Sequence, residues 1–173
     1  MPRRSMVSVA ASGMLALMMA ALPMALRGQG NATILKPPAM QKLMPATVFY
    51  RGQTATTQLR NSGGIKFADG YYVLTSLVDT SGYSTGVAAK YQAYFITEVP
   101  IHINGMRLGA GVYGIGFIAG NKFVVTDVGG HDVLTVSSAA DSGMKHPRPL
   151  EVLPDTGGKF RLYIGRSYVL LSR

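Results

Sequence analysis

The chain of 173 residues contains no cysteine and no tryptophan. Without cysteine there can be no disulfide bonds, thiolate metal sites, cysteine nucleophiles or lipid-modified lipoprotein cysteine. Charged residues are also scarce, at 14% of the chain, whereas about a quarter is usual. Because apolar residues make up 47%, we nevertheless expect a single packed domain rather than a disordered chain.

The charge that is present is mostly positive. The formal net charge is +9, and Arg3, Arg4 and Arg27 account for 3 of it, so the rest of the chain carries +6. A basic surface favours anionic partners such as polysaccharides, lipid headgroups or nucleic acid. The basic residues are scattered along the sequence, however, so a generally solvated basic surface is the alternative to one dedicated polyanion site.

The first 32 residues have the layout of a secretory signal peptide. A short basic start precedes an apolar stretch from Met6 to Leu26, and Gly30-Asn31-Ala32 offers a small-x-small cleavage site. An uncleaved anchor is the alternative, and the Arg3-Arg4 pair leaves both the general secretory and the twin-arginine route open. We therefore predict an exported protein, periplasmic or extracellular, with no membrane span after leader removal and a poor fit to nucleic acid as partner.

The remainder is predicted to be a linker followed by one all-β domain. Residues 33–46 hold three prolines without periodicity and are interpreted as an extended linker. From residue 47 to 173, short runs rich in Val, Ile, Tyr, Phe and Thr alternate with turn residues, which indicates an antiparallel β-sandwich or a barrel-like domain. Ser84–Gln92 is the one short helix expected.

Turn chemistry divides the domain into strands. Asp69-Gly70, Asn104-Gly105 and Gly129-Gly130 suit tight turns because these residues tolerate positive φ. The strands expected are 47–51, 55–60, 65–68, 71–79, 94–103, 107–118, 122–128, 131–137, 150–153, 159–164 and 168–172.

The segment Ala93–Ile103 shows the alternation most clearly. Its odd-numbered apolar residues, Phe95 among them, are expected to face the core, while Tyr94, Glu98 and His102 face water. Pro100 cannot donate to a β-ladder, so the strand is expected to be an edge or to carry a bulge there.

A glycine-rich strand supplies the candidate ligand-binding residues. The run from Gly109 to Gly114 matches the dinucleotide-binding pattern, but it continues as strand instead of opening a helix, so that match is empty. Gly114 and Gly116 lie on one face of the strand and Tyr113 lies on the other. The glycine face is expected to admit either an aromatic ring of the protein or a ligand, with Tyr94 and Tyr113 as further candidates.

The turn Asp127–Asp132 is the candidate metal site. Asp127 is expected to lie opposite Asp132, and facing carboxylates repel unless a cation, a nearby basic residue or a proton compensates them. With His131, the pair could bind a divalent cation such as calcium or perform acid–base chemistry. The alternative is an exposed hairpin end whose acids cap turn amides.

Two runs carry a resemblance to known sequences. Tyr91–Glu98 and Leu108–Phe117 resemble segments of small exported bacterial proteins of unknown function, and the Leu-x-Ala-Gly-x-Tyr-Gly run is similar to one in secreted β-sandwich domains. The resemblance implies an exported β-rich protein and brings no catalytic residues with it.

Three functions are therefore compared. The leading hypothesis is a non-catalytic binding or structural module of the periplasm or cell envelope, which uses a tyrosine-lined basic sheet face or an edge strand. Its expected partner is an anionic envelope polymer, a lipid or another envelope protein. One alternative is a carrier with an apolar cavity under the Gly114/Gly116 face, and the other is a hydrolase-type enzyme that uses Asp127, His131 and Asp132.

Overall fold

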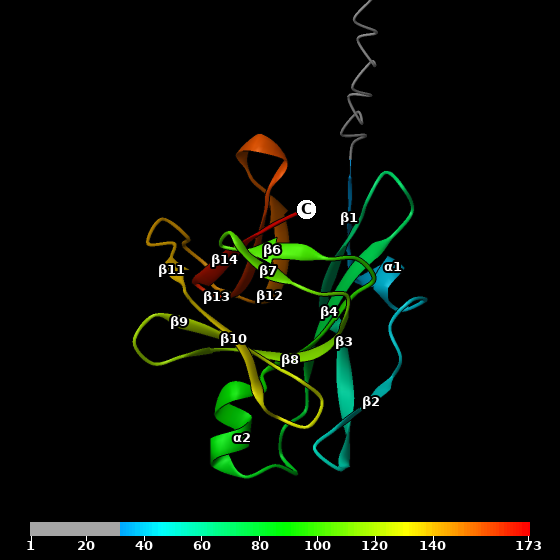
Figure 1. The fold of residues 1–173 in the computed structure, drawn as a ribbon, viewed down its shortest axis with the longest axis vertical. Helices are drawn as coiled ribbons and strands as arrows, with labels where there is room; N and C mark the ends of the chain where they lie inside the picture. The colour runs from blue at the N-terminus through cyan, green and yellow to red at the C-terminus, as the bar shows by residue number, and fades with distance from the viewer. Residues whose placement is uncertain (1–31) are drawn as a thin grey trace, which may run out of the picture.

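Two antiparallel β-sheets pack face to face in the computed structural model of the chain, which describes residues 32–173 (Figure 1). The predicted all-β, sandwich-like class is confirmed. The predicted signal peptide, residues 1–32, lies outside the described residues except for Ala32. Within residues 32–173, none of the helices combines the length and apolar character that crossing a membrane requires.

Sheet 1 has eight strands in the order β1-β3-β4-β5-β8-β9-β10, and β2 pairs with β3 beside this path. Their bounds are β1 (Thr33–Leu35), β2 (Thr47–Tyr50), β3 (Gln53–Lys66), β4 (Tyr72–Val78), β5 (Ala93–Thr97), β8 (Gly111–Ile118), β9 (Lys122–Thr126) and β10 (Asp132–Ser137).

Sheet 2 has six strands in the order β12-β13-β14-β6-β7, and β11 pairs with β14. The bounds are β6 (Ile101–Ile103), β7 (Met106–Leu108), β11 (Ala139–Ala140), β12 (Arg148–Pro154), β13 (Phe160–Gly165) and β14 (Ser167–Ser172). The helical elements are α1 (Pro37–Met40), α2 (Thr85–Lys90) and the single 3-10 turn η1 (Thr156–Gly158).

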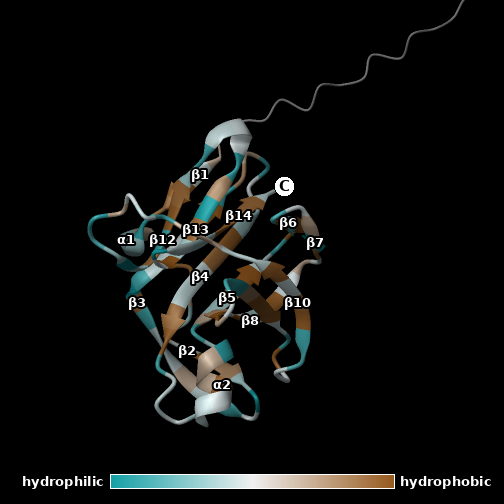
Figure 2. Ribbon diagram, turned by 90° about the vertical axis from the view of Figure 1, so that its left-hand side faces the viewer, coloured by the Kyte–Doolittle hydropathy of each residue, from teal (hydrophilic) through white to brown (hydrophobic). Residues whose placement is uncertain are grey.

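Two hydrophobic clusters lie on opposite faces of sheet 1. Successive residues of one strand divide between them, because side chains alternate along a pleat: Val73 joins the main core and Leu74 the second cluster. The main core also contains apolar residues of sheet 2. Most of the hydrophobic segments of the chain lie on strands (Figure 2). The second cluster is completed by residues of α1, β2 and the end of α2, among them Met40, Tyr50 and Tyr91.

The chain crosses from one sheet to the other at Pro100. β5 ends at Thr97 in sheet 1, and β6 begins at Ile101 in sheet 2. Phe95 and its odd-numbered neighbours point into the main core as predicted. The prediction of a wholly wet opposite face was wrong, because Tyr94 is buried in the second cluster while Glu98 is exposed. The expected edge or bulge is instead a corner between sheets.

Residues 33–46 are part of the domain, so the linker prediction was wrong. β1 pairs with Gly64–Lys66 of β3, and Leu35, Met40 and Met44 are buried in the second cluster. Pro37 and Pro38 occupy the first turn of α1, where a missing backbone N–H costs nothing. These contacts come from two short elements and the turn that follows them, which explains why the segment shows no periodicity.

The predicted helix is present as α2, preceded by Ser84. The tight turn at Asn104-Gly105 is also confirmed, because both residues have positive φ and join the paired strands β6 and β7. By contrast, the two strands expected at 55–60 and 65–68 form one strand, β3. Gly63 and Gly64 lie inside this strand. A Cβ on Gly64 would lie 2.5 Å from the carbonyl oxygen of Val73, which leaves no room for a side chain, and one on Gly63 would lie 3.3 Å from Val152.

Candidate functional site

The glycine face of β8 is filled by the protein itself. A Cβ on Gly114 would lie 2.7 Å from the ring of Tyr50 and 2.8 Å from that of Tyr91, and one on Gly116 would lie 2.4 Å from the carbonyl oxygen of Lys90. Protein atoms thus occupy the space that the carrier hypothesis assigned to a ligand. That hypothesis is corrected: the missing side chains make room for aromatic packing and for the end of α2.

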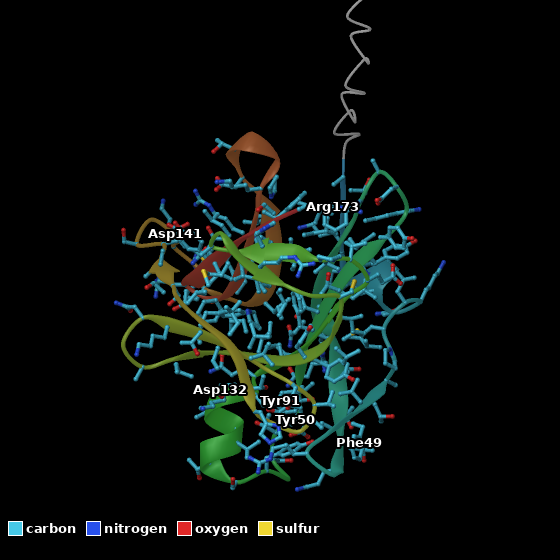
Figure 3. The ribbon with its side chains drawn as sticks, viewed as in Figure 1. Phe49, Tyr50, Tyr91, Asp132, Asp141 and Arg173 are labelled. Carbon is cyan, nitrogen blue, oxygen red and sulfur yellow. The ribbon has the colours of Figure 1, made fainter. Side chains whose placement is uncertain are left out.

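The aromatic rings over Gly114 form a stacked and hydrogen-bonded group. Tyr50 stacks on Tyr91 with ring centroids 3.7 Å apart, and Figure 3 shows the two together near α2. The Tyr50 hydroxyl lies 2.7 Å from that of Thr126, which donates to the Gly114 carbonyl. The hydroxyl of Tyr91 is buried and has no hydrogen-bond partner within residues 32–173, and burial raises its pKa.

The four residues proposed for ligand binding do not converge on one site. Tyr94 and Gly114 are cross-strand partners on the second-cluster face, where both are buried. Tyr113 lies on the opposite face and donates a hydrogen bond to the Gly109 carbonyl. Gly116 contacts the end of α2. The structure therefore brings two of the four together, in a packed interior.

The two acids of the Asp127–Asp132 turn do not face each other. Asp132 pairs across the ladder with Thr126, because a bulge in β10 shifts the register, and its carboxylate forms an ion pair with Lys90 at 2.7 Å. Asp127 accepts hydrogen bonds from the backbone N–H and ring of His131. These bonds, the backbone one foremost, lower the pKa of Asp127.

Compensation by a proton held on Asp127, one of the possibilities for facing carboxylates, is therefore not supported, because the pKa of Asp127 is lowered. The metal site and the hydrolase-type centre receive no geometric support, since each acid binds a different partner and the His131 side chain is 83% exposed. Over residues 32–173, no three histidine or acidic side chains come together as ligands for a metal ion.

One arginine of sheet 2, Arg161, lies among tyrosine and aspartate side chains. The guanidinium of Arg161 lies 4.8 Å from the ring centre of Tyr168. It also donates to the Tyr163 hydroxyl and to Asp155. Because the terminal nitrogens of Arg161 already have partners, this group is better suited to holding the loops of sheet 2 than to binding a ligand.

Within residues 32–173, acidic and basic side chains differ in how many of them have a partner in the protein. Each of the eight acids forms an ion pair or accepts a hydrogen bond from the protein. Of the 14 lysines and arginines in this part of the chain, five pair with acids, which leaves nine without an acidic partner. All nine are exposed: Lys42, Arg51, Arg60, Lys66, Arg107, Lys122, Lys145, Lys159 and Arg166.

One of these cations, Arg60, lines an open groove of about 690 Å³. The groove runs along β3. Gln41, which follows α1, lines it on one side, and Asp79, which follows β4, lines it on the other. α1 lies against β3 at one edge of sheet 1 (Figure 1). The lining residues are mostly polar: Gln41, Thr56, Thr57, Gln58, Leu59, Arg60 and Asp79.

A large bulge in β3 builds this groove. Thr57 pairs with Val78 and Ser62 with Ser76, so four residues of β3 lie opposite the single residue Leu77. A regular strand would turn alternate side chains to opposite faces, whereas here five consecutive residues, 56–60, line one groove. Sequence reasoning missed it, although the loss of apolar alternation after Ala55 was an available signal.

No protein-family model, curated protein or solved structure matches the chain. Its function must therefore be inferred from its own geometry and charge.

Proposed function

We propose that this protein is an exported, non-catalytic binding module whose partner is an anionic polymer of the periplasm or cell envelope. The observation that carries the proposal is that the acidic side chains have partners within the protein, whereas most basic side chains have no acidic partner. Every acid within residues 32–173 is held by a protein donor, while nine exposed cations have no acidic partner. Such a surface attracts polyanions and has little charge free to attract cations.

The packing of the molecule supports binding at the surface rather than inside it. Tyr50 and Tyr91 fill the glycine face, and Lys90 and His131 engage the two turn acids separately. The groove on β3 is open and lined by polar side chains. A partner would thus be met by exposed cations and hydrogen-bonding groups.

Titration of the protein with polygalacturonate and with neutral dextran tests the binding proposal. We expect polygalacturonate to bind, dextran not to bind, and the affinity to fall severalfold between about 50 and 300 mM salt as screening increases. Anionic phospholipid vesicles form a third arm. Equal binding of both polymers, or binding that salt does not weaken, would contradict a charge-based partner.

Export requires a separate test, because it rests on the sequence of residues 1–32. N-terminal sequencing of the protein recovered from outside the cytoplasm is expected to start near Thr33, directly after the small-x-small site. A mature chain that still begins at Met1 in the membrane fraction would support the anchor instead, and recovery only from the cytoplasm would contradict export.

A further inference from the structure

We infer that the groove on β3 is a binding site for a uronic-acid polysaccharide, with Arg60 binding the carboxylate and Thr56, Gln58 and Asp79 binding hydroxyl groups. This inference rests on the proposed function and assigns it to one place on the surface. It is carried by the composition of the groove and by the bulge that brings consecutive residues into it.

The groove combines one free cation with several uncharged polar groups. Arg60 is exposed and has no acidic partner within residues 32–173. A guanidinium presents its donors in a planar fork that matches a carboxylate. The side chains of Gln41, Thr56 and Gln58 add amide and hydroxyl groups that both donate and accept.

Asp79 narrows the choice of ligand. It lines the same groove, and the backbone N–H of Ser81 lowers its pKa, so it is ionised at neutral pH. A carboxylate accepts hydrogen bonds from sugar hydroxyls but repels a second anion. An anionic polymer without hydroxyl groups, such as inorganic polyphosphate, would meet only this repulsion, whereas a uronic-acid polymer offers hydroxyls to Asp79 and a carboxylate to Arg60.

The groove is partly open to solvent and its wall is ordered. Local hydrogen bonds hold its wall in place: Gln58 donates to the Val78 carbonyl, Asn61 donates to the Gln58 side chain, and Thr57 donates to the Pro45 carbonyl. The bulge is therefore a built feature of β3 and not a frayed strand.

The test compares variants of two exposed arginines that lack acidic partners. Arg60→Gln is expected to weaken binding of polygalacturonate roughly tenfold, because it removes a charge-assisted contact. Arg107→Gln on β7, outside the groove, removes the same charge and is expected to change affinity less than about twofold. Arg60→Lys keeps the charge without the fork and should fall between the two.

A neutral substitution separates recognition from net charge. Thr56→Val keeps the branched shape and removes one hydroxyl, and we expect roughly threefold weaker binding of polygalacturonate, the range of one hydrogen bond. Inorganic polyphosphate, which has charge but no hydroxyl groups, should bind more weakly than polygalacturonate. Thermal unfolding of each variant checks that the fold is retained.

The outcomes distinguish this site from the general proposal. Equal losses for Arg60→Gln and Arg107→Gln, or no effect of Thr56→Val, would overturn the groove and leave a diffuse polyanion-binding surface. Tighter binding of polyphosphate than of polygalacturonate would overturn the ligand class. Absence of binding to every anionic polymer at low salt would overturn the proposed function together with the groove.

Discussion

Strands β8 and β3 belong to the same sheet and are unusual in different ways: β8 is regular but lacks two side chains, and β3 carries a bulge. In β8, Gly114 and Gly116 lack side chains, and protein atoms fill the space so closely that an added Cβ would lie within 3 Å of them. In β3, extra residues bulge out of the ladder and leave an open groove. The absent side chains of Gly114 and Gly116 thus allow close packing, whereas the extra residues of β3 form an exposed groove.

The closed side of this comparison can be tested with Gly116→Ala. The new methyl would meet the backbone carbonyl of Lys90 at 2.4 Å, and a backbone atom cannot rotate away as a side chain can. We expect a loss of about 3 kcal/mol in the free energy of unfolding, measured by urea denaturation.

Gly86→Ala is the matched control for that experiment. Gly86 lies in α2, and a Cβ there meets no atom within 4 Å. Replacement by alanine should stabilise the protein by about 0.5–1 kcal/mol, because alanine is the better helix former. If Gly116→Ala were as harmless as Gly86→Ala, the end of α2 would not be packed on β8, and the cavity rejected above would become credible again.

The sequence predicted the class of fold and much of the pleat because both depend on local patterns. Alternating apolar residues placed Phe95 in the core, and Asn104-Gly105 specified a tight turn. The pattern could not say what lies opposite a given face. Gly114 is equally compatible with a ring or a ligand until Tyr50, more than 60 residues earlier in the chain, is placed against it.

The candidate sites were predicted less well for the same reason. The acidic turn failed because a bulge in β10 changed which residue lies opposite Asp132. The loss of apolar alternation after Ala55 could have indicated an irregular strand, but the shape of the groove depends on how many residues of β3 lie opposite each residue of β4, which one strand's sequence does not give. Registers are set by pairs of strands, so site geometry that depends on register is not available from one strand.

The tyrosine pair offers a finer test of the closed region. Tyr91→Phe removes a buried hydroxyl that has no partner within residues 32–173, so it should stabilise the fold by about 1 kcal/mol. Tyr50→Phe removes a hydroxyl bonded to Thr126 and should destabilise it by about 1 kcal/mol. Urea denaturation of both variants measures the contrast.

The sign of the contrast is the informative result, since both changes delete one oxygen from stacked rings of the same cluster. A destabilising Tyr91→Phe would show that a water or ligand group bonds to that hydroxyl. The region would then be less tightly closed than its contacts indicate.

The smallest expected effect concerns the pKa of Asp127. Its direction distinguishes an exposed hairpin end, whose acids cap turn amides, from a pair of facing carboxylates that bind a cation. Its pKa is lowered mainly by the backbone N–H of His131 and also by the His131 ring. A group whose pKa falls on folding stabilises the folded state above its unfolded-state pKa, and that contribution is lost as pH falls through the folded value. The loss should therefore appear only below about pH 4.

NMR titration of the Asp127 carboxyl carbon in the protein and in His131→Ala measures this directly. The substitution removes the ring and keeps the backbone N–H, so the pKa should rise only part of the way to the ordinary aspartate value. An Asp127 pKa above the ordinary value would restore the two facing carboxylates, and with them a reason to look for a cation at this turn.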